Sequence, residues 1–469
     1  MIKNLNFLKT RNLTAFVLLF LCAVAFAQAP GIQWQKLYGG SAADWFYKTI
    51  PTSDGGYIAV GQASSTNGDV TGAGYTKEDA WIVKTDACGN KQWDKVMGGS
   101  GTADRFYDIK QTSDGGYILV GSSDSPNSGT VSVAGKGSID VWVVKLNSSG
   151  TTQWQKLYGG SRPDHGVSVS QTSDGGYIIG GTTQSLDGDI LYTSGNVLLN
   201  FIKPLVIKID SSGNLSWVKA YMIDNYHESL QKIEQTSDGG YIFAGYAQSF
   251  DFYGHQATVY KLTSTGNVTW RKLYGDISGP TITTSASDFF YSIKQTSDGG
   301  YIALGSSSSS NSGDVSATNH GGSDLWLVKL TSTGTISWNK LLGGSGDEDL
   351  SFGDPLAIDT DGGFAICSSS TSSNSGDITG TNHGIEDAWV FKTNISGVIQ
   401  WQKLIGGSAS DNLSSVYVLG NNTYILAGNS SSSASGDVKG TNKGSSDSWL
   451  VKLGDATPVT TPTITTTAA

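Results

Sequence analysis

The chain has 469 residues, of which 30 are basic and 40 are acidic, so its formal net charge is −10. An acidic chain of this kind is not suited to bind nucleic acid or an anionic membrane through its overall charge. Three cysteines in such a length exclude a disulfide-based scaffold, so a hydrophobic core must hold the chain together.

Residues 1–27 have the features of a secretory signal peptide. Three basic residues, Lys3, Lys9 and Arg11, precede an apolar stretch over residues 15–25, and Ala25-Phe26-Ala27 fits a small-residue cleavage site. Cys22 raises the alternative of a lipoprotein, although the large Leu21 before it does not suit a lipobox. We therefore expect a protein that is secreted, extracellular or held at the cell surface.

Cleavage after Ala27 would leave 27 basic and 40 acidic residues, a net charge of −13. No later segment reaches the roughly 20 apolar residues of a membrane-spanning helix, so we expect no transmembrane segment. Cys88 and Cys367 lie several repeats apart, which predicts two free thiols. We also expect a monomer with no nucleic-acid partner.

The octapeptide QTSDGGYI occurs four times, at 111–118, 171–178, 235–242 and 295–302, with near copies at 51–58, 358–366 and 420–425. Asp-Gly-Gly between two apolar runs predicts a hairpin, because Gly supplies positive φ and Asp caps its own backbone. The aromatic residue after the turn recurs every 60 to 64 residues, at Tyr57, Tyr117, Tyr177, Tyr241, Tyr301, Phe364 and Tyr424.

Two further rows repeat in phase with the hairpin. One is a strand-like run that ends in Lys, as in AWIVK (80–84), and the other is Trp-x-Lys, as at Trp34 and Lys36; each occurs seven times. A unit of about 60 residues thus has four short runs rich in Val, Ile, Tyr and Trp, without helical periodicity. The sequence predicts an all-β fold, a seven-bladed β-propeller of four-stranded antiparallel blades.

The two ends of the repeat region complement each other, so we expect N- and C-terminal strands to share one blade and close the ring. The expected propeller spans 32–454, and 455–469 form a Thr/Pro-rich tail. The repeat units are residues 55–114, 115–174, 175–238, 239–298, 299–361, 362–421, and 422–454 plus 32–54.

The segments 79–100 (DAWIVKTDACGNKQWDKVMGGS) and 323–349 resemble the bacterial seven-bladed β-propeller repeat called SBBP. The SBBP repeat has a similar order of motifs, namely Asp-x-aromatic-x-x-Lys, Gly-Asn, Trp and Gly-Gly-Ser. The resemblance covers nearly all of 32–454. It implies a secreted propeller, typical of exported bacterial proteins, without a defined activity.

The Trp row is expected to pack between neighbouring sheets, where an indole buries a large apolar area. Asp residues at the starts of strands and in loops are expected to form Asx turns. Ca²⁺ binding is the alternative for one loop row, and no other cofactor is expected. That row comprises Asp69, Asp189, Asp314, Asp377 and Asp437.

No pattern in the chain indicates an enzyme, and we expect no catalytic residue. The five histidines, at 165, 227, 255, 320 and 383, lack metal-ligand spacing, and no nucleophile motif or phosphate-binding loop is present. A hydrolase with carboxylates in the central channel remains the alternative, because sequence does not show what lines a channel.

The repeat pattern fails over 181–288, where four loops change on two adjacent units. Since these loops leave the blades on one side, we expect their aromatic and His residues to gather on one face and to bind a ligand. The alternative is that they pack on each other at an irregular joint. The candidate residues are Tyr192, Phe201, Tyr226, His227, Phe250, Phe252, Tyr253 and His255.

These observations favour a non-enzymatic binding propeller that recognises a glycan or a protein. An extracellular glycan-cleaving enzyme and a structural spacer of the cell surface are the two alternatives.

Overall fold

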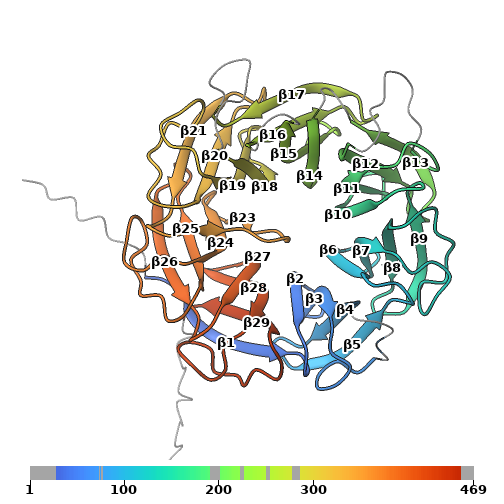
Figure 1. Ribbon diagram of the computed structural model, residues 1–469, viewed down its shortest axis with the longest axis horizontal. Coiled ribbons are helices and arrows are strands. Elements are labelled where there is room, and N and C mark those ends of the chain that lie inside the picture. Colours follow the sequence, from blue (N-terminus) through green and yellow to red (C-terminus); the bar gives the residue numbers. More distant parts are fainter. Residues whose placement is uncertain are drawn as a thin grey trace, which may run out of the picture.

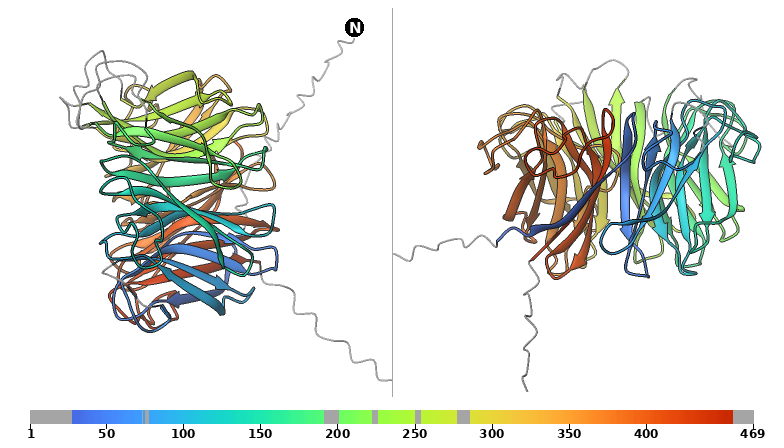
Figure 2. Two further views of the ribbon diagram at one scale, coloured as in Figure 1. Left: turned by 90° about the vertical axis from the view of Figure 1, so that its right-hand side faces the viewer. Right: turned by 90° about the horizontal axis from the view of Figure 1, so that it is seen from below.

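The computed structural model describes residues 28–72, 74, 78–190, 201–221, 226–249, 254–276 and 286–455. Over these ranges the chain forms seven antiparallel sheets arranged around a central channel (Figure 1). Seen edge-on, the strands run between the two faces of the ring (Figure 2). The prediction of a seven-bladed propeller with four-stranded blades is confirmed.

Each blade has four positions from the channel outwards, and the chain fills them in the same order every time. The innermost strands are β2 (Asp44–Pro51), β6 (Arg105–Gln111), β10 (Asp164–Gln171), β14 (Tyr226–Gln235), β18 (Asp288–Gln295), the pair β22 (Glu348–Asp349) and β23 (Leu356–Ile358), and β27 (Asp411–Gly420). The second strands are β3 (Tyr57–Ala63), β7 (Tyr117–Ser123), β11 (Tyr177–Thr183), β15 (Tyr241–Ser249), β19 (Tyr301–Ser307), β24 (Phe364–Ser370) and β28 (Thr423–Ser430).

The third strands are β4 (Asp79–Thr85), β8 (Asp140–Leu146), β12 (Lys203–Ile209), β16 (His255–Leu262), β20 (Asp324–Leu330), β25 (Asp387–Thr393) and β29 (Asp447–Gly454). The outer strands are β5 (Lys91–Met97), β9 (Thr152–Tyr158), β13 (Leu215–Ala220), β17 (Val268–Tyr274), β21 (Ile336–Leu342), β26 (Ile399–Ile405) and β1 (Gly31–Tyr38). None of the described helical segments is long and apolar enough to cross a membrane.

The ring closes because β1 pairs with β29, so the first and last strands share the blade of β27 and β28. Gln35 lies opposite Val451 in that pairing. The hydrogen-bonded sheets are offset by one strand from the sequence repeats, since each sheet begins with the innermost strand that precedes the Asp-Gly-Gly turn. Three strands from the C-terminal end and one from the N-terminal end therefore make the closing blade.

The SDGG turn behaves as its residues predict. Gly55 has φ of +84°, and the Asp54 carboxylate accepts a hydrogen bond from Gly56 N at 3.1 Å. The same carboxylate lies 2.9 Å from Lys84 Nζ, the Lys that ends the third strand. Five further blades have the equivalent Lys–Asp pair, which explains why the Lys and the turn recur together.

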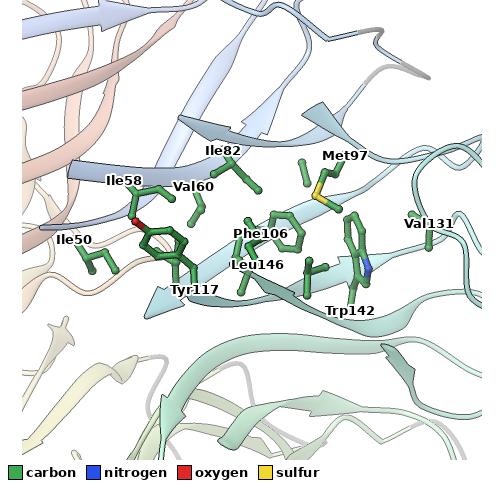
Figure 3. Packing of buried hydrophobic residues seen from close by; sticks show 14 of the residues in the cluster. Ile50, Ile58, Val60, Ile82, Met97, Phe106, Tyr117, Val131, Trp142 and Leu146 are labelled. Carbon is green, nitrogen blue, oxygen red and sulfur yellow. The ribbon is translucent and has the colours of Figure 1, made fainter. Parts of the chain in front are cut away.

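Neighbouring blades are joined through the Trp row, as predicted. The Trp34 ring on outer strand β1 lies 5.6 Å from the ring of Tyr57, the aromatic residue that follows the SDGG turn of the next blade. A methyl group on Gly89 of that next blade would lie 2.7 Å from the Trp34 ring, so the turn there needs glycine. Trp142 and Phe106, both of the blade of β6 to β9, stack at 4.6 Å in a cluster that also contains side chains of the blade of β2 to β5 and fills the joint between the two (Figure 3).

The residue between Trp and Lys in Trp-x-Lys binds the buried Trp of the third strand. Gln155 Oε1 accepts a hydrogen bond from Trp142 Nε1 at 3.1 Å. Four other blades repeat this contact through Gln35, Asp94, Asn339 and Gln402. The two remaining blades lack the third-strand Trp and have Val218 or Arg271 at this place. An indole N–H that is buried needs an acceptor, so the two positions change together.

Candidate functional site: the mouth of the central channel

The two faces of the ring are built from different connections. One face carries the tight turns that include SDGG. The other, called here the loop face, carries the loops from second to third strands and from each outer strand to the next inner strand. Residues at the beginnings of inner strands therefore surround the channel mouth on the loop face.

A pocket of about 530 Å³ lies at this mouth, which is within the usual range for small-ligand sites. Its lining includes Arg105, Tyr107, His165, His227, His255 and Phe352, and we call it the mouth pocket. These residues come from β6, β10, β14 and β16 and from the segment between β22 and β23, so no single loop makes the site.

Aromatic rings form two parts of the wall. On one side Tyr107 lies 5.0 Å from Phe352 and 5.1 Å from Tyr47, measured between ring centroids. Phe352 is 45% exposed, so its face is open to a ligand. On the other side Tyr246 lies 5.5 Å from His255, and both rings contact Phe289.

The three histidines of the pocket are held by hydrogen bonds to their Nδ1 atoms. His227 Nδ1 accepts a hydrogen bond from Ile202 N at 3.1 Å, which places the proton of the neutral ring on Nε2. His165 Nδ1 lies 3.2 Å from Ser122 Oγ, and His255 Nδ1 lies 3.1 Å from Ser287 Oγ. Each imidazole is thereby fixed in orientation at the wall.

Burial lowers the pKa of all three histidines below 6.5, and nearby positive charge adds to this effect for two of them. Arg105 is that charge for His165, and Lys203 for His227. The rings are therefore neutral at pH 7, where each offers one N–H donor or one nitrogen acceptor.

Glu228 is the one carboxylate among the described lining residues, and it is already engaged. Its Oε1 lies 2.5 Å from Arg271 Nη2, and its Oε2 accepts a hydrogen bond from the Tyr260 hydroxyl. Apart from Arg105, the remaining polar lining is neutral at pH 7 and includes Gln231 and Gln248.

Below the mouth pocket the channel contains a buried layer of charges. Asp354 Oδ2 lies 2.6 Å from Lys48, 3.2 Å from Lys232 and 3.1 Å from Lys294, measured to each Nζ. Asp108 Oδ2 is 3.2 Å from Lys232 Nζ and accepts a hydrogen bond from Val169 N. These contacts join the inner strands of several blades across the channel.

The structure brings part of the predicted patch to this pocket. His227 and His255 line it, and Phe201, which is buried, stacks on His227 at 4.8 Å with 20° between the rings. Tyr192, Phe250, Phe252, Tyr253 and the side chain of Tyr226 lie outside the described residues. Both the binding role and the packing role proposed for the patch stay predictions.

Sequence reasoning missed Arg105, Tyr107, His165 and Phe352. For Arg105 and His165 one signal was present: the residue after the acidic start of each inner strand differs in all seven repeats, while the residue before it is Asp or Glu every time. Those residues are Trp45, Arg105, His165, Ser229, Phe289, Asp349 and Asn412.

The five loop aspartates proposed for Ca²⁺ come from five different blades and have separate surroundings. Asp69 pairs with Lys443 and Asp189 pairs with Lys136, while Asp377 Oδ2 lies 3.9 Å from His320 Nε2. The backbone N of Asp314 and of Asp437 donates to Gly275 O and Gly406 O. Among the described residues no group of three or more His, Cys, Asp or Glu is placed to hold a metal ion. Ca²⁺ binding by these loops stays a prediction.

The acidic starts of the inner strands and third strands organise the loops. Asp44 accepts hydrogen bonds from Gly40 N and from the N–H and Oγ of Ser65. In the blade of β22, Glu348 and not Asp349 has this role, because Glu348 accepts from Gly344 N at 2.8 Å.

Cys88 and Cys367 are free thiols, as predicted.

Comparison with known proteins finds only distant structural similarity. No family model matches the chain, and no curated protein matches it. Among solved structures, the Neurospora crassa Pan2 WD40 domain matches with a TM-score of 0.44 and 9% identity over 90% of this chain and 98% of that one. BBS1N, solved in complex with ARL6DN, matches with a TM-score of 0.43 and 9% identity over 90% and 96%. A Bacteroides caccae protein of unknown function matches with a TM-score of 0.37 and 10% identity over 74% and 93%. Similarities at this level carry no argument about function.

Proposed function

We propose that this chain is an exported, non-enzymatic β-propeller that binds a carbohydrate in the mouth pocket. The observation that supports this most is the combination of exposed aromatic faces with neutral hydrogen-bonding groups around one pocket. Phe352, which is 45% exposed, and Tyr246, which is half-buried, offer ring faces for the C–H faces of a pyranose. The histidines and glutamines offer donors and acceptors for its hydroxyl groups.

The lining argues for binding rather than glycan cleavage. Most glycoside hydrolases use two carboxyl groups about 5–9.5 Å apart on either side of the scissile bond. Glu228 is the one carboxylate that lines the described pocket, and Arg271 and Tyr260 hold it. A single carboxylate in an ion pair does not provide the acid and base that hydrolysis needs.

Phe352→Ala and Gln231→Ala test the proposal, because both side chains line the pocket and neither is part of a blade core. We expect a glycan array and titration calorimetry to show binding by the unaltered protein and at least about tenfold weaker binding by each variant, the effect of about 1.4 kcal/mol. Tyr417→Ala is the matched control, since Tyr417 is similarly exposed but does not line the pocket. Binding that survives both pocket variants, or release of sugar from a bound glycan, would contradict the proposal.

Export and membership of the SBBP-type propellers belong to the same proposal. Their support is the N-terminal segment 1–27 and the in-phase repeat motifs. The N-terminal sequence of protein recovered from the outside of expressing cells is expected to begin at Gln28. Recovery of the uncleaved chain inside the cell would contradict export without affecting the pocket.

A further inference from the structure

The charge of the mouth pocket is unlike that of the whole chain. The chain is acidic, with 40 acidic against 30 basic residues. Among the described lining residues, however, Arg105 is the one permanent cation, and the one carboxylate, Glu228, is neutralised by Arg271. The pocket thus presents a guanidinium to its ligand without a compensating free anion on its wall.

Arg105 pairs with Glu78 and also interacts with the side chain of Tyr107. Its Nη2 pairs with Glu78 Oε2, and both side chains are about one-third exposed. Glu78 does not line the pocket, and within the described residues no second carboxylate pairs with Arg105. Its Nε is buried and has no hydrogen-bond partner among those residues. A guanidinium has five donors and binds a carboxylate best through two of them at once. Arg105 therefore retains N–H donors for a ligand.

The histidines surround the same space and extend the positive potential at low pH. His165 is next to Arg105, His227 is next to Lys203, and His255 contacts Ser287, Tyr246 and Phe289. When these rings take up protons they become cations with two donors each. A negatively charged ligand would favour that protonation, whereas a neutral ligand would not.

We infer that the mouth pocket selects a sugar acid, such as a uronic acid residue, whose carboxylate binds Arg105 in competition with Glu78. This inference rests on the proposed function and narrows its ligand to one chemical class. The sugar ring lies against Phe352, and its hydroxyl groups meet the neutral polar lining.

The test compares matched pairs of probes that differ only in charge: trigalacturonate and oligomers of glucuronate, each against its own methyl ester. We expect titration calorimetry at pH 7.5 to give at least about tenfold tighter binding of an acid than of its ester, because a charge-assisted hydrogen bond contributes about 1.5–3 kcal/mol.

Two variants separate the role of Arg105 from a structural role. Arg105→Gln should abolish the difference in affinity between the acid and its ester, whatever its effect on the affinity for the ester, and Arg105→Lys should restore part of that difference. Glu78→Gln should strengthen binding of the acid, because it removes the carboxylate that competes for Arg105. A purely structural effect of Arg105 would weaken acid and ester equally, and that result would overturn the inference.

The outcomes also separate this inference from the proposed function. Binding of esters or neutral glycans, without preference for the acids, would leave the proposed function standing and overturn the selection of sugar acids. Failure of every acid, ester and neutral glycan to bind would overturn both. An acid preference that Glu78→Gln weakens would show that the carboxylate binds elsewhere and would also overturn the inference.

Discussion

Lys232 of β14 and Asp354, which precedes β23, meet in the middle of the channel with Nζ and Oδ2 3.2 Å apart. Both side chains are almost completely buried. The same Oδ2 atom contacts Lys48 and Lys294, so one carboxylate connects its own blade to three others. Burial acts to raise the pKa of Asp354, but the three ammonium groups outweigh it and hold that pKa well below 3.8.

Asp354→Asn is expected to destabilise the ring strongly. It would leave three ammonium groups without their shared counter-ion, and removal of one partner from a buried ion pair typically costs about 3–5 kcal/mol. The free energy of unfolding in urea measures this loss. Asp298→Asn is the control, because that turn carboxylate pairs with Lys329 while mostly exposed; pairs of this kind contribute about 1 kcal/mol or less. Equal losses for the two variants would contradict a central role for Asp354.

Lys48→Met is expected to be tolerated and to change how stability depends on pH. Burial lowers the pKa of Lys48 to about 7 despite its contact with Asp354, whereas the unfolded chain keeps the ordinary value of 10.5. Between these values the unfolded state binds more protons than the folded state, so Lys48 makes stability rise with pH over that window. Urea denaturation between pH 7 and 10 should show a smaller rise in the variant. An unchanged slope would show that Lys48 stays charged in the fold.

Pairs of buried carboxylates occur at several blade joints, and they predict a second pH effect. Asp140 Oδ1 has no hydrogen-bond partner among the described residues. A methyl group on Gly159 would lie 2.5 Å from that oxygen and 2.5 Å from Asp164 Oδ2. Burial raises the pKa of both carboxyl groups. Since the folded state then holds the proton more tightly, stability falls as the pH rises through the raised pKa values.

Asp140→Asn should therefore stabilise the protein at pH 8, by about 1 kcal/mol, the contribution of a typical hydrogen bond. The amide oxygen would keep the bond from Lys136 N, and the amide N–H₂ would donate towards Asp164. Thermal unfolding at pH 4 and pH 8 measures the effect, which should be larger at pH 8. The turn variant Asp114→Asn should have the opposite sign, because hydrogen bonds from Thr112 and Lys145 hold the pKa of Asp114 at about 2. Destabilisation by Asp140→Asn at pH 8 would contradict the interpretation that the buried pair of ionised carboxylates, Asp140 and Asp164, lowers stability at high pH.

Gln35→Leu and Gln155→Leu test the closure of the ring. Gln35 accepts from Trp449 Nε1 at 3.0 Å across the pairing of β1 with β29, as Gln155 accepts from Trp142 within one continuous blade. Each variant leaves a buried indole N–H without an acceptor, which costs about 1–3 kcal/mol. Urea denaturation should give similar losses for both. The exposed Gln33→Leu is the control and should change little. A loss confined to Gln155→Leu would show that the closing blade is frayed.

Much of the fold could be predicted from the sequence because its signals are local. Gly in the SDGG turn needs positive φ, Asp caps the turn, and strands of β-branched and aromatic residues separate such turns; each of these properties belongs to a short segment. The seven-fold recurrence then gives the number of blades, and the complementary ends give the closure. The packing role of Trp34 and its equivalents follows from a constant position in every repeat.

The candidate site depended on the tertiary structure, because residues that are constant in the repeat build the blades while those that differ line the channel. Arg105, His165, His227 and Phe352 come from four blades and meet only when the ring brings the inner strands around one axis. Distances across a channel join residues far apart in sequence, and no local pattern encodes them. The sequence by itself determined that seven sheets form and close. Only the closed ring decided which charges are buried together, as at Asp354, and which side chains share a pocket.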